Sequence, residues 1–257
     1  MFSPINRIAS ICIVVCFLLI SVTAAQKRPP TKKTLPAPSA KQKTEKYVPG
    51  TVVDERLSVL RMEPSLYSIP LQRMRRGRTV LIYSTREADG VMFYSVMVPP
   101  DKRGWVQAEA VASASRPGDD ARLARLVQVS DGFEQLERAA LFLETFPNSP
   151  LRPAMLLYQG DLLEEMAQKL SFEAHKKLDK EEMAANGAPL HSFFLNYAGL
   201  DRYRRLGITF IFNANTGYFH YDGEYWKELT ARFPATKEAA EAKKRLEELA
   251  GKMRQEK

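Results

Sequence analysis

The stretch that decides the fold reads LSVLRMEPS at residues 57–65, MRRGRTVLI at 74–82 and RGWV at 103–106. Short runs of β-branched and aromatic residues occupy 79–83 and 91–98, and the second run alternates between two sets of side chains. Gly77 lies just before the first run and Gly90 lies between the two runs, and each follows a polar residue in a predicted turn. Short strands joined by tight turns predict a small β-barrel over residues 51–113. A parallel sheet is excluded here because no connection is long enough for a crossover helix.

Four motifs follow one another in this stretch: an apolar-x-Val pair with Arg and Pro-Ser, a basic-basic-Gly turn, an aromatic-aromatic-x-Val strand and a closing Gly-Trp-Val. They are Leu57-Ser58-Val59 with Arg61 and Pro64-Ser65, Arg75-Arg76-Gly77, Phe93-Tyr94-Ser95-Val96, and Gly104-Trp105-Val106. In this order they resemble a bacterial SH3 (SH3b) domain. Glu63 stands where that family usually has Gly, and Phe93 where it often has Trp. The resemblance implies a non-catalytic binding module of the bacterial cell envelope, often directed at peptidoglycan or proteins.

Five aromatic side chains are candidates to line the ligand groove of such a module. They are Tyr67, Tyr83, Phe93, Tyr94 and Trp105. Aromatic faces stack on sugars and peptides with little loss of entropy. In so small a barrel the same residue types also form the core, and we interpret Phe93 and Trp105 first as core residues. Tyr67 and Tyr94, beside a turn or on the opposite face, are the stronger candidates for ligand contact.

The first 25 residues have the pattern of a signal peptide. Arg7 precedes an uncharged apolar run over 11–20, and the small residues Ala24 and Ala25 suit a signal peptidase. The alternative is an uncleaved anchor, because 8–25 approaches the length that spans a bilayer. Both alternatives predict a periplasmic or secreted protein. Only an uncleaved leader would attach it to the membrane.

Residues 26–50 are rich in Pro and Lys, which predicts a disordered, extended linker. The whole chain has a net charge of +8. This linker has seven basic residues against Glu45, and with Arg7 it accounts for all but one of those charges. The nearly neutral remainder argues against a nucleic-acid partner. The linker either keeps the domain clear of the membrane or interacts with anionic envelope polymers.

Residues 117–257 have the pattern of a helical domain. Two similar turns, Phe146-Pro147-Asn148-Ser149 and Phe233-Pro234-Ala235-Thr236, lie 87 residues apart. In each turn, Pro ends one amphipathic helix and the hydroxyl residue is expected to cap the next. These turns resemble the helical hairpins of tetratricopeptide (TPR-like) envelope proteins. The spacing is not a multiple of 34 residues, so we predict hairpins rather than a regular array.

Helical periodicity predicts the individual elements of this domain. The expected helices are 132–145 with a capping-box-like start at Asp131, 149 to about 178 capped by Ser149, 189–206, 222–232, and a last helix with Ala239, Ala242, Leu246 and Leu249 on one face. The β-prone runs 208–212 and 218–221 predict a short β-hairpin inserted among these helices.

Motifs for catalysis are sparse. The sequence has no serine elbow, P-loop or Gly-rich dinucleotide turn. Its two cysteines, Cys12 and Cys16, both lie in the leader, so a mature chain would have no disulfide, thiolate or cysteine metal site.

The best metal candidate is His220, Asp222 and Glu224, which share one face if a strand continues through them. The alternative is that Asp222 caps a helix and His220 is a surface strand residue. The adjacent pairs Glu164-Glu165 and Glu181-Glu182 point apart on a helix and are expected in solvent. We therefore predict no enzyme, no cofactor and no metal.

The predicted fold class is α+β: a small SH3-like β-barrel followed by an all-α, TPR-like helical domain with a short β-hairpin insertion. The expected function is that of a non-enzymatic exported adaptor. Its barrel recognises a cell-wall or protein ligand, and its helical hairpins bind a protein partner. A structural subunit of an envelope complex is the alternative, and a metal-dependent hydrolase is less favoured.

Overall fold

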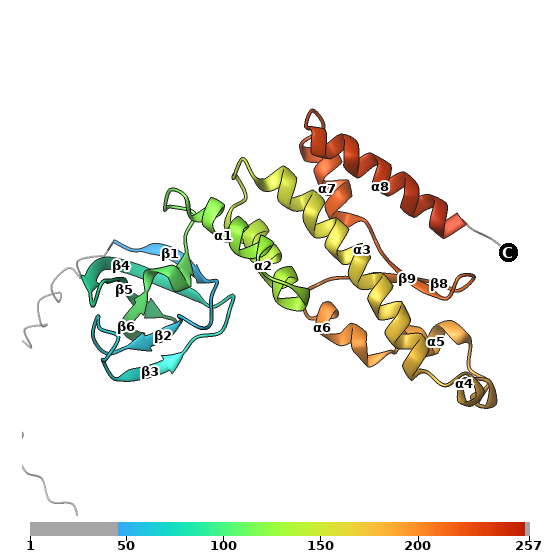
Figure 1. Cartoon of the computed structure of the whole chain (residues 1–257), viewed down its shortest axis with the longest axis horizontal. Helices are drawn as coiled ribbons and strands as arrows, with labels where there is room; N and C mark the ends of the chain where they lie inside the picture. The colour runs from blue at the N-terminus through green and yellow to red at the C-terminus, as the bar shows by residue number, and fades with distance from the viewer. Residues whose placement is uncertain (1–45, 255–257) are drawn as a thin grey trace, which may run out of the picture. The chain divides into compact units, whose positions relative to one another are not determined.

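The computed structural model describes residues 46–254 (Figure 1). The predicted leader and nearly all of the predicted linker lie outside the described residues. The described part has the α+β class: a seven-stranded antiparallel sheet is followed by eight α-helices and a β-hairpin. Within it, no helix combines the length and the apolar character that crossing a bilayer requires.

The sheet is built from seven short strands. They are β1 (Val48–Val52), β2 (Val59–Arg61), β3 (Pro70–Arg73), β4 (Thr79–Ala88), β5 (Val91–Val98), β6 (Lys102–Gln107) and β7 (Val111–Ala112). Their order in the sheet is β3-β2-β6-β5-β4-β1-β7. The first strand begins at Val48, inside the stretch predicted as a linker, because Val48 and Val52 pack in the sheet.

The sheet is open among the described strands, whereas the sequence predicted a closed barrel. The end strands β3 and β7 pair with one neighbour each and not with each other. The shortness of the end strands and the exposure of β3 give a physical reason why the sheet does not close. The β7 strand has two residues before the chain turns toward α1, and both terminal residues of β3, Pro70 and Arg73, are exposed.

Side chains that alternate along the strands between the two faces of the sheet place an apolar set on the buried face. Val96 and Val98 of β5 are buried together with Leu60, Val80 and Val106. Steric contact explains why the Gly-Trp-Val motif has a glycine at position 104. A Cβ at Gly104 would lie 2.6 Å from the carbonyl oxygen of Arg61 on β2.

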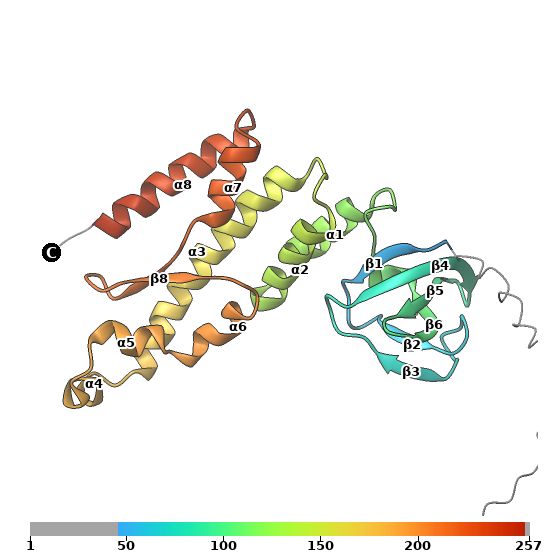
Figure 2. The same ribbon diagram turned by 180° about the vertical axis from the view of Figure 1, so that it is seen from behind.

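The helical half contains eight α-helices and a two-stranded hairpin within the described residues (Figures 1 and 2). The helices are α1 (Asp119–Gln128), α2 (Gly132–Thr145), α3 (Arg152–Lys177), α4 (Lys180–Asn186), α5 (Leu190–Leu195), α6 (Asp201–Arg204), α7 (Glu224–Arg232) and α8 (Lys237–Arg254). The hairpin strands are β8 (Phe210–Asn213) and β9 (Tyr218–Tyr221). The 3₁₀ turns are η1 (Ala108–Ala110) and η2 (Ala198–Leu200).

Several predicted helices and the hairpin are confirmed. Helix α2 covers the predicted 132–145, and β8 pairs with β9 as a hairpin. Thr236 caps α8 by accepting a hydrogen bond of 3.2 Å from the amide of Ala239. The predicted apolar face of α8 is turned inward, with Ala239 and Ala242 fully buried.

Other predictions for the helices are wrong. Residues 189–206 do not form one helix: α5 ends at Leu195, and a 3₁₀ turn precedes α6. The ring of Tyr197 folds against Gly199, where a Cβ would lie 2.3 Å from that ring, so the local chain does not follow a regular helix. Asp131 precedes α2 without a side-chain capping bond. Ser149 accepts from the amide of Leu151, but α3 begins later, at Arg152.

Helix α3 is central to the helical half, because α2, α7, α8 and β9 all contact it. Its Gly160 lies directly against Trp226 of α7, whose side chain is 1% exposed. Leu163 and Ala167 on the same helix are fully buried.

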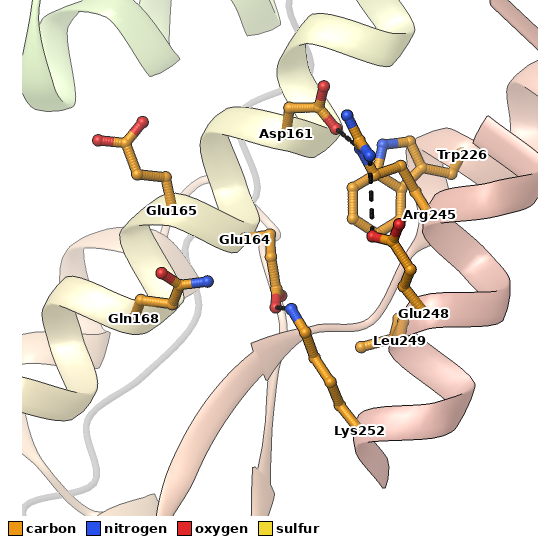
Figure 3. Close-up of a pocket in the computed structure, with 9 residues that line it drawn as sticks. All are labelled: Asp161, Glu164, Glu165, Gln168, Trp226, Arg245, Glu248, Leu249 and Lys252. Carbon is orange, nitrogen blue, oxygen red and sulfur yellow. Dashed lines mark hydrogen bonds and ion pairs between the residues drawn. The ribbon is translucent and has the colours of Figure 1, made fainter. Parts of the chain in front are cut away.

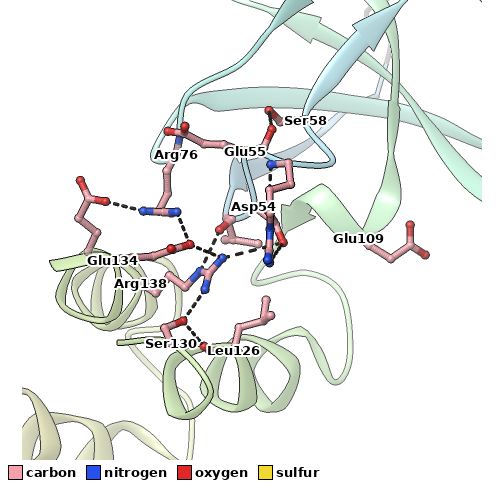
Figure 4. A network of polar contacts seen from close by, with 12 residues as sticks. Asp54, Glu55, Ser58, Arg76, Glu109, Leu126, Ser130, Glu134 and Arg138 are labelled. Carbon is pink, nitrogen blue, oxygen red and sulfur yellow. Dashed lines mark hydrogen bonds and ion pairs between the residues drawn. The ribbon is translucent and has the colours of Figure 1, made fainter. Parts of the chain in front are cut away.

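A polar network joins the sheet to the first helices (Figure 4). Arg76, in the β3–β4 turn, forms ion pairs with Glu134 at 2.6 Å and with Glu137, both on α2. Arg138, also on α2 and almost fully buried, pairs with the same Glu134 at 2.6 Å and lies 3.9 Å from Asp54. One carboxylate therefore links a cation from the sheet to a cation from the helices.

Candidate functional site

A pocket of about 460 Å³ opens on the sheet beside Trp105. Three segments form it: Glu63 to Ser65 from the β2–β3 loop, Arg86 to Ala88 from the end of β4, and Trp105 from β6. Trp105 is partly buried and lies opposite Arg61 of β2 and Ser95 of β5 in the sheet register. The Trp105 ring is therefore held on a paired strand, beside the β2–β3 loop and the end of β4.

Asp89 fixes the shape of the loop at this pocket. Its carboxylate accepts hydrogen bonds from the hydroxyl of Ser65, at 2.7 Å, and from the amide of Leu66, at 2.8 Å. These bonds lower the pKa of Asp89 below its ordinary value. Arg61 also donates to the carbonyl of Ser68, at 2.9 Å. The loop is thus tied both to the β4–β5 turn and to β2.

Large apolar side chains project from this loop. Tyr67 is 90% exposed, Ile69 63% and Met62 55%. Three exposed apolar side chains from one hydrogen-bonded loop are a candidate interaction surface. Their side chains can contact a ligand without first leaving a folded core.

The predicted groove aromatics do not converge on this pocket. Trp105 lines it, and Tyr67 lies on the loop that forms one wall. Tyr83 packs against Tyr47, with ring centroids 6.1 Å apart, and beneath the Arg103 guanidinium at 4.9 Å. Phe93 is fully buried.

Tyr94 is also buried, at 5% exposure. Arg116 donates a hydrogen bond to its hydroxyl and lies over its ring, and burial raises the pKa of Tyr94. Phe93 and Tyr94 therefore both belong to the interior of the sheet. The burial of Phe93 agrees with its interpretation as a core residue.

The structure separates the three side chains of the predicted metal candidate. Strand β9 ends at Tyr221, so the strand does not continue through Asp222 and Glu224. The carboxylate of Asp222 instead accepts a 3.1 Å hydrogen bond from the amide of Glu224 at the start of α7. Across residues 46–254, no three His, Cys, Asp or Glu side chains gather in a way that could hold a metal ion.

His220 is not a surface residue, and Glu164 is not in solvent, contrary to both predictions. His220 is 7% exposed and Glu164 8% exposed. The carboxylate of Glu164 accepts from the His220 ring at 3.0 Å, from the amide of Tyr221 at 3.0 Å and from the Lys252 ammonium at 2.7 Å. Burial alone would raise the pKa of Glu164, but these hydrogen bonds lower it to about 2.

This carboxylate borders a second pocket, of about 280 Å³, between α3 and α8 (Figure 3). The sequence did not predict this pocket, because two adjacent carboxylates on a helix are expected to point apart into solvent. The available signal was spacing: acidic and polar residues recur at 161, 164, 165 and 168, which lie on one face of a helix. Glu181 and Glu182, by contrast, are exposed as predicted.

Comparison with known proteins found no matching family model, no matching curated protein and no matching solved structure.

Proposed function

We propose that the chain is a non-enzymatic exported adaptor. Its sheet binds a peptide-bearing ligand of the bacterial envelope, either the stem peptides of the cell wall or a segment of a protein. Its helical half binds a protein partner through the TPR-like hairpins. The signal-peptide pattern of residues 1–25 and the SH3b resemblance of residues 51–113 are the sequence grounds for this proposal.

The observation that carries the proposal is the fixed apolar loop beside Trp105. Tyr67, Ile69 and Met62 are exposed on a loop that Asp89 and Arg61 already hold in one shape. A surface that is ordered before binding loses little conformational entropy when a ligand arrives. Aromatic and apolar anchors next to a partly open ring suit an extended peptide better than a highly charged ligand.

A capture experiment tests the proposal with the full chain, produced with its own leader. The chain is incubated separately with purified peptidoglycan and with an envelope protein extract, and the bound fraction is measured. Tyr67→Ala removes the most exposed anchor, and Trp105→Ala removes the ring of the pocket. Val129→Ala is the matched control, because Val129 is 80% exposed at the end of α1, outside this pocket.

The expected result is capture by one of the two materials, with a loss of about tenfold or more in both test variants, as for the central anchors of an interface. The control is expected to bind like the parent chain. Capture by neither material would refute the proposal. Equal capture by all variants, together with a stable complex of fixed stoichiometry, would instead favour the structural-subunit alternative.

A further inference from the structure

Another pocket of the helical half, of about 440 Å³, lies beside the end of α3. The end of α3, helices α4 and α5 and the β8–β9 turn contribute its walls, and α4 and α5 lie next to the end of α3 (Figure 1). Small-molecule sites in proteins occupy about 300–1,000 Å³, so this pocket has the size of a ligand site. None of the residues that carry the adaptor proposal lines it.

Apolar side chains form much of the pocket lining. Met183 of α4 and Phe194 of α5 are buried, and Leu190, at the start of α5, is 47% exposed. Ala184 and Ala188 also line the pocket, and their small side chains fill little of it. Apolar surface of this kind is stabilised when an apolar group displaces water from it, so the complementary ligand has an apolar body.

Aromatic rings extend this apolar surface beyond the pocket. The ring of His175 packs against Phe194 inside the pocket, with centroids 5.0 Å apart, and against Tyr218 outside it, at 5.8 Å. Tyr218 in turn packs against Phe172 at 6.1 Å, and Phe172 is 66% exposed. The apolar surface is therefore continuous from a buried ring to one in solvent, which suits an extended apolar chain.

Hydrogen bonds within the protein fix the walls of the pocket. The side-chain oxygen of the buried Asn213 accepts from the amides of Asn215, at 2.9 Å, and Thr216, at 3.4 Å. The Nε2 atom of His175 lies 2.8 Å from the carbonyl oxygen of Gly217, so the ring is held against the β8–β9 turn. The pocket is therefore formed before a ligand enters, and binding costs little conformational entropy.

The pocket lining has a cation and no carboxylate. Lys180 makes no ion pair or hydrogen bond with the described residues. Its neighbour Asp179 lies outside the lining, and the Asp179 carboxylate caps α4 by accepting from the amide of Glu181 at 2.8 Å. Thr216 adds a second donor, because its hydroxyl oxygen is buried without a hydrogen-bond partner in the described part of the chain. Both unpartnered groups can donate, so the complementary polar group of a ligand is an anionic acceptor.

We infer that this pocket binds an amphipathic carboxylate with an alkyl chain, the chemistry of a fatty acid. The alkyl chain lies against Met183, Leu190 and Phe194, and the carboxylate pairs with the Lys180 ammonium. The inference goes beyond the adaptor proposal and does not depend on it, because it concerns neither the ligand of the sheet nor a protein partner.

Isothermal titration calorimetry of the full chain tests this ligand class. The probes are octanoate, octanol and octylammonium, which share one alkyl chain and differ in the charge of the head group. Lys180→Gln removes the cation, and Ala184→Phe fills the pocket from an exposed position on α4. Lys176→Gln is the matched control, since Lys176 is exposed near the end of α3 outside the pocket lining. Circular dichroism checks that each variant is folded.

Octanoate is expected to bind saturably and octanol about tenfold more weakly, because octanol lacks the charge-assisted contact with Lys180. Octylammonium should bind more weakly still, because its head group has the same charge as Lys180. Lys180→Gln should weaken octanoate binding about tenfold and leave octanol binding unchanged, a difference that a general loss of structure would not produce. Ala184→Phe should abolish the binding of both probes, and Lys176→Gln should bind like the parent.

Absence of saturable octanoate binding would overturn the inference and leave the pocket to an apolar side chain of a protein partner. Octanol or octylammonium that binds as tightly as octanoate would overturn it too, as would unchanged octanoate affinity in Lys180→Gln or in Ala184→Phe. The capture of envelope material through Tyr67 is measured independently. Failure of the titration alone refutes the pocket beside the end of α3, and failure of the capture experiment alone refutes the proposed role of the sheet.

Discussion

Replacement of Gly160 by alanine tests the packing at the centre of the helical half. In an exposed helix interior, Gly→Ala stabilises a protein by roughly 0.8–1 kcal/mol, because alanine loses less backbone entropy on folding. At Gly160, however, the new Cβ would lie 2.3, 2.6 and 2.7 Å from three atoms of the Trp226 ring. Overpacking of this kind costs about 1–3 kcal/mol. With Trp226 itself confined in the core, we take the upper half of that range and expect a net loss of about 1–2 kcal/mol.

Gly251→Ala provides the matched control within α8. A Cβ at Gly251 meets no atom within 4 Å, so this variant should gain the full helix-propensity term of roughly 0.8–1 kcal/mol. Both free energies of unfolding are measured by urea denaturation of the full chain, with tryptophan emission and circular dichroism as probes. If Gly160→Ala stabilises the chain as much as Gly251→Ala does, the close contact between α3 and Trp226 is wrong.

Three further predictions concern buried groups. Glu164→Gln should remove a pH dependence of the free energy of unfolding. Because the pKa of Glu164 is lowered from 4.5 to about 2, its carboxylate contributes about 3 kcal/mol of stability above pH 4.5, and this contribution is lost as the pH falls toward 2. Acid unfolding curves of the parent and the variant that coincide would contradict this prediction. Arg138→Ala should lower the free energy of unfolding, measured in urea, by about 3 kcal/mol, because it removes a buried cation from the sheet–helix junction. Arg232→Ala is the control: it breaks a half-exposed ion pair and should cost less than about 1 kcal/mol. Phe93→Ala should cost about 3–5 kcal/mol in thermal unfolding and Tyr67→Ala almost none, and equal losses would disprove their different burial.

The sequence predicted elements that local patterns determine. Helix α2 and the β8–β9 hairpin follow from periodicity and turn residues, and the hydroxyl of Thr236 caps α8 where the Phe-Pro turn predicted a cap. Helix α1 is not among the predicted helices, although Leu123 and Val127 have helical spacing and are buried.

The sequence could not predict features that depend on long-range contacts. Whether the sheet closes depends on its end strands, which are 4 and 2 residues long and have few residues to specify pairing. Glu164 appeared as one member of a solvated acidic pair, yet its neighbours Tyr221 and Lys252 are 57 and 88 residues away in sequence. Tyr94 appeared as a ligand candidate because its partner Arg116 lies outside the predicted barrel. In each case the deciding partner comes from another element.

The environment of Glu164 also has a consequence for the order of folding. The three groups that satisfy this carboxylate lie 56, 57 and 88 residues beyond it in the chain. Until they arrive, water is the better partner for an ionised carboxylate, and burying that face of α3 is unfavourable. Closing such long loops is slow because the entropy is lost before the contacts form. We therefore expect the acidic face of α3 to become buried late in folding, as the hairpin and α8 dock onto it.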